Sequence, residues 1–318
     1  MPELSNINVV REILGRHGFK FSKSFGQNFI VNPDLCPRIA EESGVGPGIC
    51  ALEIGPGMGV LTKELALRAE KVLSIEIDKA LLPVLKETLG EFDNVTILNA
   101  DVLELDLKAV IKEHFGDMPF VVCANLPYYI TTPIIMSLLE SGVKFKTITV
   151  LVQKEVAQRM AAKENTKEYG ALTCAVQFYT KASLCSKIPA SCFYPAPKVD
   201  SQVIRLERLE KPLVDVKDEE TFFKTVKAAF AMRRKTLANN LIAGFNISRE
   251  TAENIIEEHF MTIIKPEICG NKVILSTEDE RQVCLQCTND SVKINVEERM
   301  ITDTKLKNEW GNVMYRIT

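Results

Sequence analysis

Residues Phe120 to Pro133 read FVVCANLPYYITTP, an apolar run that ends abruptly in Asn-Leu-Pro-Tyr-Tyr. Five apolar residues bounded by turn signals, Phe120 to Ala124, predict a buried strand of a parallel sheet. The residues that follow then lie at the carboxyl end of that strand, where open α/β sheets bind ligands. Pro127 disfavours a helical conformation at Leu126. Asn125 and the backbone after it can therefore accept from a planar amine, although a simple proline turn fits the same residues.

The composition is that of a globular protein, with 318 residues of which 46% are hydrophobic. No apolar run reaches the roughly 18 residues that a membrane span needs. Nine cysteines, an odd number lying mostly in apolar runs, indicate reduced thiols in a cytoplasm. Cys284 and Cys287 form a single C-x-x-C without nearby histidines, which is weak support for a metal site. We expect a cytoplasmic monomer that needs no metal and no membrane.

A second strand pattern, Ile49 to Ile54, leads through Gly55-Pro-Gly57-Met-Gly59 into a helical pattern from Val60 to Ala69. A strand that turns at glycines into a helix brings backbone amides close to a ligand. The spacing is G-x-G-x-G and not the G-x-G-x-x-G of dinucleotide sites, and Glu53 would repel a pyrophosphate. The pattern favours a ligand with cationic groups, such as S-adenosylmethionine.

Acidic residues follow the next two predicted strands. Val72 to Ile77 carries Glu76 about 20 residues beyond the glycine turn, where an acid can accept both hydroxyls of an adenosine ribose. Asp78 is the rival for that role. The strand Val95 to Leu98 leads to Asp101, which could accept from an adenine amine. Each acid alone could be a turn or cap residue, but their succession at strand ends predicts one ligand-binding edge.

Further strands are predicted at Ile148 to Val152, Thr173 to Tyr179 and Gln202 to Glu207, with a helix from Lys154 to Ala162. Together with the four strands above they complete a doubly wound α/β sheet of seven strands. Beyond residue 211 the pattern changes to three helical segments, which are Glu219 to Ala231, Arg234 to Ile242 and Arg249 to His259.

Two basic segments point to RNA. Between Glu12 and Asp34 there is no acidic residue, and cations alternate with aromatic rings in the order Arg16, Phe19, Lys20, Phe21, Lys23 and Phe25. A solvated arm whose rings cover the core is the alternative. From Thr221 to Ile247 the chain has no acid and five cations, Lys224, Lys227, Arg233, Arg234 and Lys235. Because solvated helix surfaces usually mix signs, the second segment favours a phosphate-binding face.

These motifs together resemble a class I S-adenosylmethionine-dependent methyltransferase that acts on the exocyclic amine of adenine. The motifs are Glu53-x-Gly55-x-Gly57-x-Gly59, Glu76, Asp101 and Asn125-Leu126-Pro127-Tyr128. Four flanking segments narrow the resemblance to the ribosomal RNA adenine dimethyltransferases, closest to the small-subunit 16S rRNA branch. The segments are Phe25 to Phe29, Tyr129 to Pro133, Gln153 to Arg159 and Phe193 to Ser201. The resemblance runs from about Val9 to about Phe260.

The resemblance implies a fold, a cofactor and a substrate. The fold is a methyltransferase domain over residues 1–210 with an RNA-contacting arm, then a small helical RNA-binding domain over 211–260, and the tail 261–318 diverges from the family. S-adenosylmethionine would lie among Asn28, Ile30, Gly55, Glu76, Asp101 and Asn125. Asn125 and the carbonyl of Leu126, held by Pro127, would accept from the target amine. The target would be two adjacent adenines in a hairpin loop of 16S rRNA in the 30S subunit.

Tyr128 and Phe193 would sandwich the extruded adenine, unless Phe193 belongs to the core. Three other functions remain open. The large-subunit 23S branch, which confers antibiotic resistance, shares the chemistry, and a non-catalytic ribosome assembly factor could share the fold. A dinucleotide oxidoreductase could use the same sheet, but the glycine spacing and Glu53 argue against it.

Overall fold

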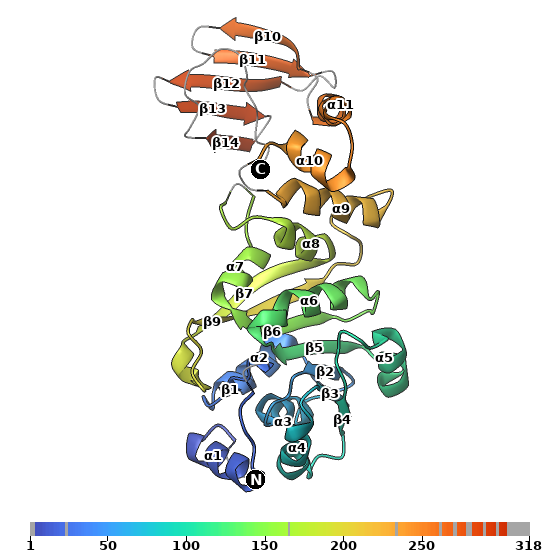
Figure 1. Cartoon of the computed structure of the whole chain (residues 1–318), viewed down its shortest axis with the longest axis vertical. Helices are drawn as coiled ribbons and strands as arrows, with labels where there is room; N and C mark the ends of the chain where they lie inside the picture. The colour runs from blue at the N-terminus through green and yellow to red at the C-terminus, as the bar shows by residue number, and fades with distance from the viewer. Residues whose placement is uncertain are drawn as a thin grey trace. The chain divides into compact units, whose positions relative to one another are not determined.

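The computed structural model describes residues 4–22, 25–164, 166–232, 235–260, 263–269, 272–277, 282–288, 291–296 and 299–303, with side chains up to residue 256. The chain divides into two compact units (Figure 1). The larger unit comprises Met1–Ala162 and Glu168–Asp215, and the smaller unit comprises Lys163–Lys167 and Val216–Thr318.

A seven-stranded sheet forms the centre of the larger unit. Its strands are β2 (Cys50–Ile54), β3 (Val72–Glu76), β4 (Val95–Asn99), β5 (Phe120–Asn125), β6 (Thr147–Gln153), β7 (Thr180–Ile188) and β9 (Ser201–Arg208). They lie in the order β4-β3-β2-β5-β6-β9-β7. The strands β2 to β6 are parallel, and β9 runs antiparallel to β6 and to β7. The predicted doubly wound sheet of seven strands is therefore confirmed.

Helices cover both faces of this sheet (Figure 1). One face packs on α5 (Leu107–Phe115), α6 (Thr131–Glu140), α7 (Lys154–Met160) and α8 (Ala171–Tyr179). The other face packs on α2 (Leu35–Ser43) and α3 (Val60–Ala66), and a third cluster joins α1 (Ile7–Arg16) to α4 (Leu82–Leu89). Because both faces are covered, every residue of β2 and β3 is buried, including Glu53 and Glu76.

Short elements complete the larger unit beside the sheet. Strands β1 (Phe29–Ile30) and β8 (Phe193–Tyr194) pair antiparallel, with Phe29 opposite Tyr194 and Ile30 opposite Phe193. Single-turn 3₁₀ helices of the described chain include η2 (Lys79–Leu81), η3 (Tyr128–Ile130) and η4 (Ala190–Cys192). The pair β1 and β8 thus joins the segment after the N-terminal arm to the loop that precedes β9.

The strand predicted at Thr173 to Tyr179 is wrong, because these residues belong to helix α8. The Thr173 hydroxyl accepts a hydrogen bond from the Gly170 amide at the start of the helix. Leu172, Ala175 and Val176 then lie on one buried face, at the spacing of a helix. The edge strand of the sheet follows immediately as β7.

The smaller unit contains helices α9 (Glu219–Phe230), α10 (Leu237–Phe245) and α11 (Arg249–Phe260). A Cβ atom added at Gly244 of α10 would lie 2.4 Å from the Cβ of Ala228 of α9, so the two helices cross in close contact. Beyond them, strands β10 (Ile263–Cys269), β11 (Lys272–Thr277), β12 (Gln282–Thr288), β13 (Ser291–Val296) and β14 (Arg299–Asp303) pair in sequence as an antiparallel sheet. Cys284 and Cys287 fall in β12, outside the residues with described side chains.

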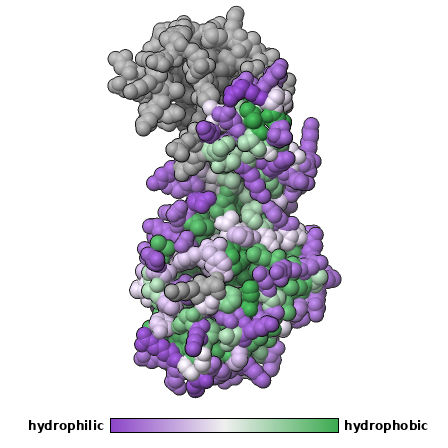
Figure 2. Space-filling model, viewed as in Figure 1, coloured by the Kyte–Doolittle hydropathy of each residue, from purple (hydrophilic) through white to green (hydrophobic). Residues whose placement is uncertain are grey.

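Among the described residues, no helix is both long and apolar enough to cross a membrane. On the face in Figure 2, hydrophilic residues are spread widely over the larger unit, and hydrophobic residues show between them. In the described part of the chain the buried side chains are mostly apolar, and the charged exceptions are Glu53, Glu76 and Asp78.

Candidate active site

A cavity of about 240 Å³ opens at the carboxyl ends of β2, β3 and β5. The strand order reverses here, because β3 lies on one side of β2 and β5 on the other, which is where open α/β sheets bind ligands. All six residues proposed for the cofactor line the cavity: Asn28, Ile30, Gly55, Glu76, Asp101 and Asn125. Among the described residues that line it, none is Lys, Arg or His.

The glycine turn after β2 needs glycine for conformation and for space. Gly55, Gly57 and Gly59 have φ angles of +71°, +59° and +85°, in the left-handed region. A Cβ atom at Gly57 would lie 3.1 Å from the ring of Phe29, and one at Gly59 would lie 3.0 Å from Leu89. The turn therefore brings backbone close to the cavity and packs directly on the β1 segment.

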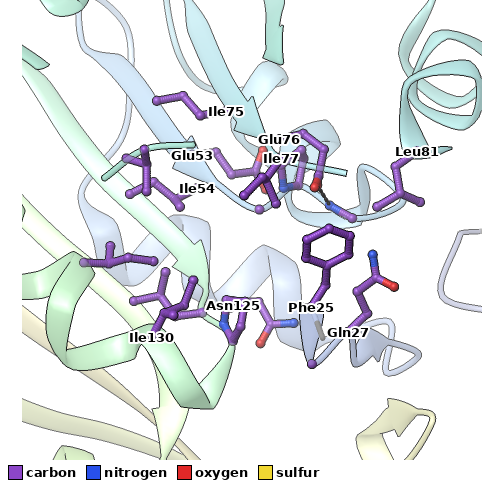
Figure 3. Close-up of a pocket in the computed structure, with 18 of the residues that line it drawn as sticks. Phe25, Gln27, Glu53, Ile54, Ile75, Glu76, Ile77, Leu81, Asn125 and Ile130 are labelled. Carbon is purple, nitrogen blue, oxygen red and sulfur yellow. Dashed lines mark hydrogen bonds between the residues drawn. The ribbon is translucent and has the colours of Figure 1, made fainter. Parts of the chain in front are cut away.

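Two buried carboxyl groups, Glu53 and Glu76, line the same cavity (Figure 3). Ser74 donates to Glu53 over 2.7 Å, and the Glu76 carboxylate accepts from the amides of Asp78 at 2.8 Å and Gly57 at 3.4 Å. Burial raises the pKa of each to about 7. A cationic ligand would lower both pKa values, whereas a pyrophosphate would raise them further.

Asp78, the alternative to Glu76 as acceptor for the ribose hydroxyls, forms hydrogen bonds outside the cavity. It accepts from Gln27 over 2.7 Å and from the Ala80 amide, and it is absent from the lining of the cavity. The Gln27 contact ties the segment Phe25–Phe29 to the end of β3. Asp101 lines the cavity and accepts from the Leu103 amide, which fixes its carboxyl in the loop after β4.

Asn125 ends β5 at the opposite side of the cavity from Glu76 (Figure 3). Its amide donates to the backbone carbonyl of Asn28 over 2.9 Å. Within the described residues, neither the Asn125 side-chain oxygen nor the Leu126 carbonyl accepts a hydrogen bond. The Leu126 amide donates to Leu151 on β6, and Pro127 precedes the turn η3. Two acceptors are therefore held at one edge of the cavity by the strand and by the proline.

Tyr128 lines the cavity, and its hydroxyl is 2.6 Å from the Ser201 hydroxyl. Burial raises the pKa of the Tyr128 phenol, so the ring stays neutral and available for stacking. Phe193 lies differently. It is 4% exposed, packs in the core with Ile30 and Val203, and does not line the cavity. Stacking by Phe193 requires its ring to leave that core, and the role stays a prediction.

The proposed RNA-binding cations differ in whether they already form ion pairs. Arg16 forms ion pairs with Glu12 and Glu87, and His17 shares Glu87 with it. Lys20, Lys224, Lys227 and Lys235 are exposed and form no ion pair within the described part of the chain, although Lys224 lies 4.8 Å from the centre of the Phe245 ring. Lys23, Arg233 and Arg234 lie outside the described residues.

Several contacts that shape the site were not predicted from the sequence. They are the bonds from Asn125 to Asn28, from Gln27 to Asp78 and between Tyr128 and Ser201. Ser201 stands at the end of the quoted segment Phe193 to Ser201, so the motif included it without assigning it a role. The other two join residues 97 and 51 positions apart, and no local pattern links them.

The sheet order, the glycine turn and the acid-lined cavity define a class I methyltransferase. Among the solved structures that share this fold are two methyltransferases. A dimethyladenosine transferase from Plasmodium falciparum is 27% identical over 72% of this chain and 80% of its own, with a TM-score of 0.59. The 23S rRNA methyltransferase ErmE is 31% identical over 72% of this chain and 89% of its own, with a TM-score of 0.55.

Residues 18–265 match the family described as Ribosomal RNA adenine dimethylase. A ribosomal RNA small subunit methyltransferase A from Bacillus licheniformis is 51% identical over 77% of this chain and 84% of its own length. Its namesake from Streptococcus thermophilus is 44% identical over 86% of this chain and 94% of its own. The chain therefore belongs to the ribosomal RNA adenine dimethylase family and is an rRNA adenine dimethyltransferase, as the motifs indicated.

Proposed function

We propose that this enzyme uses S-adenosylmethionine to dimethylate two adjacent adenines in a hairpin loop near the 3′ end of 16S rRNA. The substrate is the 30S subunit in the cytoplasm, and the reaction accompanies small-subunit biogenesis. One observation carries the chemistry. Asn125 and Leu126 present two acceptors, without partners among the described residues, at the edge of a cavity that two carboxyl groups line.

The residues present suit S-adenosylmethionine, which supplies a methyl group already activated by a sulfonium. Glu76 stands at the end of β3 with both carboxylate oxygens toward backbone amides and the cavity, as a ribose acceptor requires. Asp101 and the buried Val102 both line the cavity, which supports contacts from them to the adenine amine and the adenine ring. The absence of cations from the described lining favours this ligand over a dinucleotide.

The acceptors act on the target amine. The adenine N6 lone pair is delocalised into the ring, which makes it a weak nucleophile. Hydrogen bonds from N6 to the Asn125 oxygen and the Leu126 carbonyl favour tetrahedral geometry and expose the lone pair. The nitrogen then gains the methyl carbon as the carbon–sulfur bond breaks, and its proton leaves to water. Orientation supplies most of the rate, because the methyl group is already activated.

The remaining proposed residues bind RNA. Tyr128 stacks on the extruded adenine from one side, a contact worth on the order of 1 to 3 kcal/mol. Phe193 covers the other side once its ring turns out of the core. The helical segment 211–260 contributes Lys224, Lys227 and Lys235 to the phosphates, together with Arg233 and Arg234, and the N-terminal arm contributes Lys20 and Lys23. Arg16 contributes least to RNA binding, because its charge is neutralised by the ion pair with Glu87.

Two other functions are tested against this one. ErmE is a 23S rRNA methyltransferase, and because this chain is similar to it, a large-subunit substrate is the first alternative. A non-catalytic ribosome assembly factor is the second alternative. It would have the same fold, but it would not require the Asn125 and Leu126 acceptors for a target amine. The high identity to relatives named for the small subunit supports the 16S substrate.

The substrate is tested by methyl transfer from labelled S-adenosylmethionine to unmodified 30S and 50S subunits. Digestion of the product should yield labelled dimethyladenine from 16S rRNA and none from 23S rRNA. Label confined to 50S subunits would assign the enzyme to the large subunit. Tight binding to 30S without label would make it an assembly factor.

A further inference from the structure

A cation lies over an aromatic ring at the surface of the larger unit. The Arg11 guanidinium of α1 lies 4.9 Å from the centre of the Tyr194 ring, and Phe21 meets Tyr194 edge-on with 5.6 Å between ring centres. Arg11 is exposed and Phe21 is 37% exposed. The guanidinium carbon lies over the ring, and no described residue accepts a hydrogen bond from the guanidinium N–H groups, so these groups are available to a ligand.

The charge of Arg11 is uncompensated in this arrangement. Within the described residues, Arg11 forms no ion pair and no hydrogen bond through its side chain, whereas Arg16 on the same helix contacts Glu12 and Glu87. The nearby Lys20 is also exposed and unpaired there. An arginine that pairs with no described residue, beside the exposed Phe21 ring, differs from an ordinary solvated helix face, where charges of both signs alternate.

This surface adjoins the active site through Phe29. The Phe21 and Phe29 rings lie 5.4 Å apart, Phe29 pairs with Tyr194 across β1 and β8, and Phe29 itself lines the cavity. Phe29 therefore links this surface to the cavity that the target base is proposed to enter. A site here would therefore hold nucleotides that flank the target.

We propose that Arg11, Phe21 and Tyr194 form a binding site for single-stranded RNA next to the target adenine. The Arg11 N–H groups bind a phosphate, and a neighbouring base stacks against the exposed Phe21 ring, which the partly buried Tyr194 supports from the side. The site rests on the proposed function for its biological substrate and adds contacts apart from the cationic helices of the smaller unit. It lies in the larger unit, within the segments that position Asn28 and Phe29.

The alternative role for Arg11 is structural, as a clamp that holds α1 against β8. The salt dependence of RNA affinity separates the two roles. Each phosphate contact on a single strand contributes about 0.7 to the slope of log affinity against log salt. A clamp would change the melting temperature and leave that slope unchanged.

Binding of a labelled oligoadenylate RNA to the full chain should be measured by anisotropy over a range of salt. We expect Arg11→Gln to weaken binding about fivefold and to lower the slope by about 0.7, and Arg11→Lys to retain the slope. Lys112→Gln is the charge-matched control, because Lys112 of α5 already pairs with Asp117, which follows that helix. Equal slopes for Arg11→Gln and Lys112→Gln would overturn the proposal.

Ultraviolet crosslinking of the wild-type protein to the same RNA gives a readout that needs no variant. Crosslinked peptides should contain Phe21 or Tyr194, and crosslinks that miss both would contradict the site. Methyl transfer by the wild type to unmodified 30S subunits is measured in parallel. If transfer fails while the Arg11 slope and the crosslinks hold, the proposed substrate is wrong and the RNA site stands.

Discussion

The side-chain amide of Asn125 donates to the backbone carbonyl of Asn28 over 2.9 Å, and the Asn125 oxygen at the cavity accepts no hydrogen bond from any described residue. The segment between the arm and β1 thereby orients the residue proposed to receive the target amine. Orientation is the property that the chemistry needs most, since a misplacement of about 1 Å can lower a rate about 100-fold.

Asn125→Asp tests that orienting bond. The variant keeps an acceptor oxygen but sets a second carboxylate oxygen against the Asn28 carbonyl, so the side chain must turn away. We expect methyl transfer at saturating RNA to fall by at least about 100-fold. Rates within about threefold of wild type would show that the bond to Asn28 does not position the acceptor.

The Tyr128 and Ser201 hydroxyls should act as one unit, because they are 2.6 Å apart. Tyr128→Phe and Ser201→Ala should each lower methyl transfer by about threefold to tenfold, and the double variant should be no worse than either. Tyr128→Ala should raise the KM for RNA by more than about tenfold through lost stacking. Additive losses in the double variant would mean that the two hydroxyls work separately.

Cofactor affinity should rise with pH. Burial raises the pKa of Glu76 from 4.5 to about 7, so the folded protein binds more protons than the unfolded chain between these values. The stability of the free enzyme therefore falls as pH rises through that window. Only ionised Glu76 accepts both ribose hydroxyls, so affinity for S-adenosylhomocysteine should increase about tenfold between about pH 6 and pH 8.

Calorimetric titrations at several pH values measure this dependence. Glu76→Gln should bind more weakly and show a smaller increase with pH, the remainder coming from Glu53, whose pKa burial also raises to about 7. An affinity for the wild type that is flat or falls across the same range would contradict the assignment of Glu76.

Gly57→Ala and Gly48→Ala form a matched pair. Both glycines have positive φ angles, +59° and +74°, so each substitution should lower the free energy of unfolding by about 1 to 2 kcal/mol. A Cβ atom at Gly48 would meet nothing within 4 Å, whereas one at Gly57 would meet the Phe29 ring. We expect Gly57→Ala alone to weaken cofactor binding, and equal cofactor affinities in the two variants would contradict this.

Gly244→Ala should disturb the smaller unit alone. The added methyl group would lie 2.4 Å from the Ala228 Cβ, which forces α9 and α10 apart. RNA affinity should fall, while the affinity for S-adenosylhomocysteine should stay within about twofold of wild type. A cofactor affinity that is nearly unchanged would exclude damage to the cavity. Unchanged binding to 30S subunits would remove these helices from the RNA interface.

Much of the fold could be predicted because apolar strands end in distinctive residues at one edge of the sheet. Glu53, Glu76 and Asn125 could be identified as candidate site residues from the sequence for that reason. The sequence predicts a strand from Thr173 to Tyr179 because threonine, valine and aromatic residues favour strands. In the structure these residues form a helix that packs against α6 and α7, and this packing has no local signal in the sequence. The pairing of Arg16 with Glu87, 71 residues away, has no local signal, and neither has the inward direction of the Phe193 ring.

The central claim is that Asn125 holds the target amine, and single-turnover methyl transfer by wild type and Asn125→Ala to unmodified 30S subunits tests it most directly. S-adenosylhomocysteine affinity is measured on the same preparations. The account predicts a loss in rate of about 100-fold to 1,000-fold with cofactor affinity changed by less than about tenfold. Transfer by Asn125→Ala at the wild-type rate would contradict it.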